Sequence, residues 1–145
     1  MDVKVRCVGG VKFEITARNH KVESDQPPDN HGTDTAMTPP ELFLSALAAC
    51  AAYYAEEYLR ARGLPDEGLE IRVAGEKGDK PVRIVSIQID VIAPGLTQRH
   101  RDGVLRAVDA CLLKNTLRVP PEMNVRVVGS AEEAVEEPLL LTADH

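Results

Sequence analysis

The sequence predicts a protein of the α+β class, in which an antiparallel sheet is combined with a long buried helix and a second, amphipathic helix. Helical start signals and apolar spacing mark residues 39–62 and 98–110. The chain of 145 residues suits a single domain with one core, which we assign to residues 1–130, followed by an acidic tail over 131–145. Runs of alternating apolar and polar residues, typical of half-buried strands, occupy 3–8, 11–18, 69–73, 82–92 and 123–128.

The first two strands are predicted to form a hairpin. Residues 3–8 and 11–18 are joined by Gly9-Gly10, and glycines supply the positive φ angles that a tight turn requires. The polar stretch 19–38 that follows consists mainly of turn-forming residues. Because loops of this length in compact domains tend to be functional, this loop is a candidate cover for a site.

The long helix has clear predicted boundaries. Thr38-Pro-Pro-Glu41 has the composition of a capping box, and Gly63 can adopt the left-handed conformation that ends a helix. Between Leu42 and Ala55, apolar residues occupy every face, so this helix must be covered on all sides. A chain of this size has difficulty covering it alone. The simplest remedy is a homodimer in which each subunit covers the helix of the other.

The second half of the chain is predicted to supply further strands and the amphipathic helix. Strands 69–73 and 82–92 are connected by a loop over 75–81, and a last strand at 123–128 precedes the acidic tail. Thr97 can cap the helix between them. The apolar side of this helix carries Val104, Leu105 and Val108, and its polar side carries Arg101, Arg106 and Asp109.

Charge and hydropathy exclude several classes of function. The formal net charge is −6, and the seventeen Lys and Arg residues are scattered, so nucleic acid is not an expected partner. No segment approaches the roughly twenty apolar residues of a membrane span, and no positively charged start leads into an apolar run. We therefore expect a cytoplasmic protein that does not associate with membranes.

Three cysteines are too few for a disulfide scaffold. Cys50 lies within the apolar helix, Cys111 closes the second helical pattern, and Cys7 sits in the first strand, where we expect it to serve in packing alone. The sequence neighbours of Cys50 and Cys111 offer nothing that would lower a thiol pKa. From these neighbours alone, each is more often a plain core residue, and a redox-active pair is the alternative.

Two other chemistries find little support in the sequence. The four histidines, His20, His31, His100 and His145, have no ligand-like spacing with either cysteine, so a zinc site is not expected. A serine hydrolase is not expected either, because the chain has no Gly-x-Ser-x-Gly motif.

The order of motifs along most of the chain resembles that of a known family. Thr38-Pro-Pro-Glu-Leu-Phe-Leu-Ser-Ala-Leu-Ala-Ala-Cys50 is followed by Gly68-Leu-Glu-Ile-Arg-Val, by Ile92-Ala-Pro-Gly-Leu and by Cys111-Leu-Leu-Lys-Asn-Thr-Leu117. From about residue 11 to residue 129, the pattern resembles the OsmC/Ohr family of osmotically inducible and organic hydroperoxide resistance proteins. It is more similar to the OsmC-like branch than to Ohr proper.

The resemblance implies a thiol peroxidase built as an intertwined α+β homodimer, with active sites at the subunit interface. It implies that Cys50 attacks the peroxide and becomes a sulfenic acid, and that Cys111 resolves it as an intramolecular disulfide. An external dithiol, lipoyl-type in the better-known branches, would restore both thiols. No metal, flavin or haem is needed, and the expected partners are a second copy, a peroxide and a dithiol reductant, which a lipoyl protein can supply.

The resemblance also implies groups that activate Cys50. Arg18, after the hairpin, is the candidate cation that would lower the thiol pKa and orient a hydroperoxide. Glu41 is the candidate catalytic carboxylate. His20 and Asp25 are expected to be loop anchors rather than acid–base groups.

The motifs depart from the family pattern at both cysteines. The hydroperoxide-resistance branch carries its functional glutamate ten positions before the cysteine, where this chain has Pro40, and Glu41 stands nine positions before, so capping is its alternative role. Cys111 is followed by Leu112 where the family usually has proline, and Lys114 stands where histidine is common. The second hypothesis is therefore a non-catalytic dimer that binds a small apolar or thiol-reactive ligand in the interface cleft.

Overall fold

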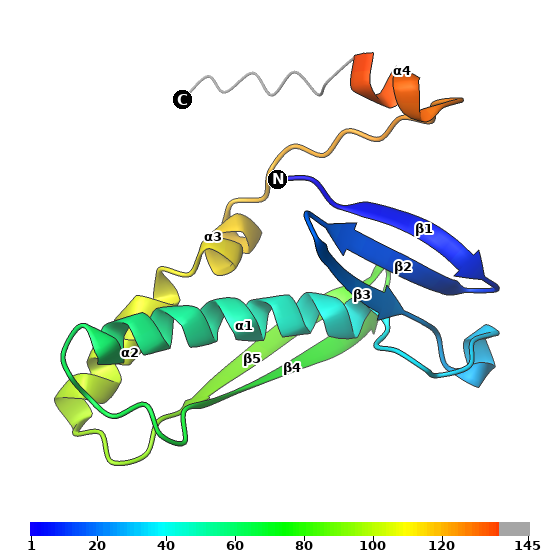
Figure 1. Cartoon of the computed structure of the whole chain (residues 1–145). Coiled ribbons are helices and arrows are strands. Elements are labelled where there is room, and N and C mark those ends of the chain that lie inside the picture. Colours follow the sequence, from blue (N-terminus) through cyan, green and yellow to red (C-terminus); the bar gives the residue numbers. More distant parts are fainter. Residues whose placement is uncertain (137–145) are drawn as a thin grey trace.

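The computed structural model describes residues 1–136 and confirms the α+β class (Figure 1). Helix α1 lies along a two-stranded ribbon of β4 and β5 and also contacts α2 and α3. The three-stranded sheet β1-β2-β3 makes no extensive contact with any other described element. The strands are β1 (Lys4–Gly9), β2 (Lys12–Ala17), β3 (His20–Ser24), β4 (Glu70–Asp79) and β5 (Val82–Ile92); the α-helices are α1 (Pro39–Arg60), α2 (Gln98–Asp109), α3 (Leu112–Arg118) and α4 (Ala131–Glu136).

The predicted N-terminal hairpin is confirmed, but the chain continues into a third strand that the sequence did not reveal. β3 pairs antiparallel with β2, and Ala17 lies opposite His20, so that Arg18 and Asn19 form the turn. Arg18 adopts a left-handed φ of 54° there. The prediction of a loop from residue 19 onward was wrong at this point, because Val22 is the only apolar residue in β3 and leaves no alternating pattern.

The remainder of the predicted loop is organised around the carboxylate of Asp25, which is only 1% exposed. Its Oδ2 accepts hydrogen bonds from the backbone N–H and the hydroxyl of both Thr33 and Thr35, and its Oδ1 accepts one from the N–H of Gln26. These bonds, the one from the Thr33 hydroxyl foremost, hold the pKa of Asp25 well below its ordinary value. Asp25 is therefore a loop anchor, as expected from the sequence.

The second sheet is a long ribbon whose first strand extends further than predicted. Residues 75–81 were expected to form a loop, but β4 runs on to Asp79 and pairs with β5 as far as Val82, leaving only Lys80-Pro81 in the turn. This end of the ribbon is mostly exposed to solvent. Its polar and charged residues, which in the sequence suggest a loop, can therefore belong to a strand.

Helix α1 begins and ends as predicted. Glu41 Oε2 accepts hydrogen bonds of 2.7 Å from both the N–H and the hydroxyl of Thr38, and Gly63, with φ 59°, follows the last turn. The buried side of the helix repeats every four residues, at Leu47, Ala51, Ala55 and Leu59. Among the described residues, no helix is long and apolar enough to cross a membrane.

Helix α2 packs on α1 through a narrow stripe. Val104 and Val108 join the core around Leu59, whereas Leu105 is 64% exposed and lies outside it. The close approach of the two helices depends on Gly103, because a Cβ there would lie 1.9 Å from Tyr58 Oη and 2.2 Å from Tyr58 Cζ.

A Gly103→Ala substitution is expected to destabilise the fold by about 1–3 kcal/mol, although alanine favours a helix by about 1 kcal/mol. The added methyl would collide with the ring of Tyr58, which packs against the core. Urea denaturation of both proteins measures the change. In a Tyr58→Ala background the same substitution is expected to stabilise, since the collision is gone and the helix preference remains. An equal effect of the substitution in the two backgrounds would contradict this account.

The chain beyond α3 differs most from the prediction. Residues 120–128 belong to no sheet, so the strand expected at 123–128 is wrong for the isolated chain. In Figure 1 this segment runs away from the rest of the molecule toward α4, which occupies the start of the predicted acidic tail. The rest of that tail, 137–145, lies outside the described residues.

Candidate active site

The fold brings Cys50 and Cys111 together although 61 positions separate them. Cys50 lies in the middle of α1, between the buried residues Leu47 and Ala51, and Cys111 is the residue at which α2 gives way to α3. The two Sγ atoms are 2.8 Å apart, and both cysteines are free thiols. A disulfide bond measures about 2.05 Å, so a small movement of either residue is enough to form one.

The two thiols differ in accessibility and in their surroundings. Cys111 is 2% exposed, whereas Cys50 is only partly buried. Burial, and next the hydrogen bond with Cys111, raise the pKa of Cys50 above its ordinary value. The backbone N–H groups of Leu113 and Leu112 act in the opposite direction and favour the thiolate. These amides belong to the first turn of α3, and N–H groups at the start of a helix stabilise a thiolate.

An ion-pair cluster holds the junction between α2 and α3 at Cys111. Asp109 Oδ1 and Oδ2 accept hydrogen bonds of 3.1 and 3.3 Å from Arg118, and Asp109 also pairs with Lys114. The bonds from Arg118 first, and then the bond from Lys114, lower the pKa of Asp109 to about 2. Lys114, for which the sequence suggested no role, therefore fixes the turn that presents Cys111.

The structure does not bring the other candidate residues to Cys50. Arg18 is exposed in the turn between β2 and β3, and its side chain has no hydrogen bond or ion pair within residues 1–136. Glu41 caps α1, and the bonds from Thr38 lower its pKa. Glu41 stands nine positions before Cys50 on the helix, which corresponds to about 13 Å along the axis and about half a turn around it. Cys7 is exposed on β1.

The amides of Leu112 and Leu113 are the part of the site that sequence reasoning missed. Backbone groups leave no mark in a residue pattern. The one available signal for these donors was the position of Cys111 at the end of one helical pattern. A residue in that position can begin a new helix, and the first N–H groups of a helix have no partner within it.

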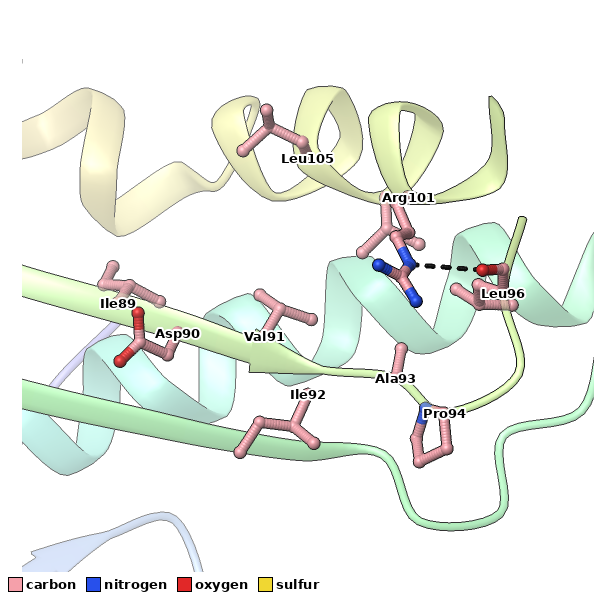
Figure 2. A pocket seen from close by; sticks show the side chains of 10 residues that line it. Ile89, Asp90, Val91, Ile92, Ala93, Pro94, Leu96, Arg101 and Leu105 are labelled. Carbon is pink, nitrogen blue, oxygen red and sulfur yellow. Dashed lines mark hydrogen bonds between the residues drawn. The ribbon is translucent and has the colours of Figure 1, made fainter. Parts of the chain in front are cut away.

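A groove of the described chain lies apart from the cysteines. It has a volume of about 480 Å³ and lies between β5 and α2. Figure 2 shows the side chains of Ile89 and Val91 on its β5 side and Leu105 on its α2 side. Arg101 lines the groove as well, and its Nε donates a hydrogen bond of 3.1 Å to the carbonyl of Leu96. The groove is mainly apolar, as a ligand pocket commonly is.

A family model and several solved structures show which known proteins this chain is similar to. The family model for OsmC-like protein matches residues 32–126. Among curated proteins, none matches the sequence significantly. A solved OsmC-like protein from Mycoplasma pneumoniae superposes with a TM-score of 0.68 at 19% identity, over 88% of this chain and 94% of that one.

Two further solved structures have a similar fold. A candidate osmotic stress induced and detoxification response protein from Psychrobacter arcticus has a TM-score of 0.73 at 20% identity, over 79% of this chain and 85% of the other. The organic hydroperoxide resistance protein OhrB of Bacillus subtilis has a TM-score of 0.57 at 19% identity, over 82% and 90%. At these identities the likeness establishes the shared fold.

Proposed function

This chain belongs to the OsmC-like protein family, and from that premise we propose that it reduces organic hydroperoxides or hydrogen peroxide through Cys50 and Cys111. Family membership and the hydroperoxide resistance proteins among its structural neighbours support a role in peroxide detoxification or stress defence. The observation that carries the specific mechanism is the contact of 2.8 Å between two free thiols from distant parts of the chain.

The proposed reaction uses the two thiols in sequence. The Cys50 thiolate attacks one peroxide oxygen, the O–O bond breaks, and the leaving alkoxide takes up a proton to become an alcohol, or water from hydrogen peroxide. Cys50 is now a sulfenic acid. The Cys111 sulfur attacks the Cys50 sulfur, water leaves, and a disulfide forms. An external dithiol, which a lipoyl group can supply, then reduces this disulfide and is itself oxidised to a disulfide.

The division of roles follows from the surroundings of each thiol. Cys50 is the more accessible cysteine, and the N–H groups of Leu112 and Leu113 favour its thiolate. Cys111 is nearly inaccessible and lies in contact with Cys50, which suits a residue that reacts only with its neighbour. Arg18 does not reach Cys50 within one chain, but its side chain has no hydrogen bond or ion pair within residues 1–136, so it remains our candidate for a cation that a second copy brings to the site.

We further propose that the active form is a homodimer, because two apolar surfaces of the chain lack a cover. On α1, Phe43, Ala46, Ala49 and Tyr53 follow helical spacing and are all exposed, Tyr53 by 60%. Their face of α1 is distinct from the buried stripe that begins at Leu47. An exposed apolar stripe on a central helix favours contact with a second copy.

The second uncovered surface is the extended segment after α3. Met123, Val125 and Val127 alternate with polar residues and are 84%, 95% and 98% exposed. This is the pattern of a half-buried strand that lacks both a neighbouring strand and a cover. β1 is an edge strand of a sheet with no extensive contact to the rest of the described chain. Pairing between two copies would give hydrogen-bond partners to the backbone of this segment and to the backbone of a free edge strand.

One equivalent of cumene hydroperoxide is expected to convert the reduced protein into a form with an intramolecular Cys50–Cys111 disulfide, because the two sulfurs already touch. Mass spectrometry of the non-reduced peptides identifies the link, and addition of dihydrolipoamide should restore both thiols. A Cys7→Ser protein should behave as the wild type, since Cys7 lies exposed on β1 and its thiol, within residues 1–136, bonds only to the carbonyl of Gly10. Thiols that persist after peroxide treatment, or a disulfide that includes Cys7, would contradict the proposal.

A second candidate function rests on the apolar groove beside Ile89 and Val91. Its volume of about 480 Å³ and its lining suit a non-catalytic role in which the protein binds a small apolar ligand. The peroxide experiment separates the two functions, because a protein that only binds such a ligand keeps Cys50 and Cys111 reduced.

A further inference from the structure

A cleft of about 390 Å³ lies between the C-terminal end of α1 and α2, on a surface that the proposed peroxidase chemistry does not use. The residues that line it are Tyr58, Arg62, Arg99, His100, Gly103, Arg106 and Ala107. Three of the seven are arginines and none is an aspartate or glutamate. This concentration of positive charge stands out in a chain whose formal net charge is −6.

The arginines of this cleft are not used for structural ion pairs. Arg99 and Arg106 lie seven residues apart on α2, and therefore on the same face. Neither side chain has a hydrogen bond or ion pair within residues 1–136. Asp102, which lies between them on this helix, accepts a hydrogen bond from Gln98 and from neither arginine. Guanidinium groups without a direct ion pair can offer all their N–H donors to a bound anion, which would also offset their mutual repulsion.

The remaining groups give the cleft a fixed shape. Arg62 lies over the ring of Tyr58 with its Cζ 3.8 Å from the centroid, and its Nη1 donates to the Tyr58 carbonyl at 3.3 Å. Tyr58 Oη and His100 Nδ1 are 3.3 Å apart. Gly103 allows the Tyr58 ring to sit against α2, because any Cβ there would overlap the ring. Tyr58 thus holds the guanidinium of Arg62 in place, whereas those of Arg99 and Arg106 have no partner within residues 1–136.

We propose that this cleft binds a small, multiply charged phosphate anion, with Arg99 and Arg106 as its main ligands. Guanidinium groups match phosphate oxygens through paired N–H donors, and such charge-assisted bonds are stronger than neutral ones. The volume is enough for a diphosphate or for a sugar phosphate, and both present the same chemistry to the arginines. The site is independent of Cys50 and Cys111.

Isothermal titration of the full-length protein with pyrophosphate, at about 0.15 M salt, tests the proposal. We expect saturable binding with a Kd below about 1 mM. An Arg99→Gln/Arg106→Gln protein should bind about a hundredfold more weakly, about tenfold for each arginine. Both side chains are exposed, so the variant should keep the thermal stability of the wild type. Ribose 5-phosphate, titrated in parallel, tells whether the site prefers the diphosphate or a phosphate ester.

Arg101→Gln is the matched control. It removes the same charge from the same helix, but Arg101 lines the groove beside β5 rather than this cleft. It should leave the affinity for pyrophosphate unchanged. The proposal is overturned if neither phosphate compound binds saturably, if the double variant binds as tightly as the wild type, or if citrate binds equally well.

Discussion

A Cys50→Ser protein is expected to lose dithiol-driven consumption of cumene hydroperoxide by about a thousandfold or more. A serine hydroxyl is not oxidised to a sulfenic acid, so the first bond cannot form. Peroxide loss in the presence of dihydrolipoamide measures the effect.

The rate of the wild type should rise about tenfold per pH unit near neutrality, because the pKa of Cys50 is raised and only its thiolate reacts.

Cys111→Ser is the matched comparison, because it replaces the second sulfur at the same contact. This variant should still react once with peroxide and then accumulate a sulfenic acid, which dimedone traps. Turnover supported by a small dithiol should fall less than in Cys50→Ser. If Cys50→Ser retained the wild-type rate, or if Cys111→Ser were the inactive variant, the assignment of nucleophile and resolving residue would be wrong.

Substitution of both Val125 and Val127 by lysine is expected to convert a dimer into a monomer. In the isolated chain these side chains are almost fully exposed, and we attribute this to a strand whose neighbour and cover come from a second copy. Two charges on its apolar face would have to be buried in the dimer, at a high cost. Light scattering during size-exclusion chromatography should give a mass of twice 15.8 kDa for the wild type and 15.8 kDa for the variant.

Asn124→Lys provides the control for this experiment. Asn124 alternates with the two valines along the same segment, and among the residues that the structure describes its side chain bonds only to Glu122. A lysine there should leave the dimer intact. A wild-type protein that stays monomeric at micromolar concentration would contradict the dimer, and so would a Val125→Lys/Val127→Lys protein that still forms one.

The parts of the fold that the sequence predicts correctly are those with local causes. The start of α1 depends on Thr38 and Glu41, which are three residues apart, and its end depends on the conformation of Gly63. The N-terminal hairpin likewise follows from a glycine pair between two alternating runs. These signals act within a few residues and therefore remain visible in a single sequence.

The elements that were missed have causes outside their own segments. β3 forms because β2 offers it an edge, although its own residues show no apolar alternation. The segment 123–128 has the alternation but finds no neighbouring strand within the described chain. A strand needs both a pattern and a partner, and the sequence shows only the pattern.

The candidate site divides in the same way. The sequence drew attention to Cys50 and Cys111 only through the order of motifs along the whole chain, because their neighbours suggested ordinary core residues. Their contact is a property of the fold. The donors that favour the Cys50 thiolate, the amides of Leu112 and Leu113, are backbone groups that any residue would supply.

The two cysteines belong to helices that differ in how firmly they are packed into the core. Cys50 lies on α1 between residues fixed in the core, whereas Cys111 leads into α3, a short helix with no buried residue. If the two sulfurs join as proposed, we expect the adjustment to fall on α3 rather than on α1. The outer surface of α3 would then differ between the oxidised and reduced protein, and a reductant that docked there would distinguish a molecule that has reacted from one that has not.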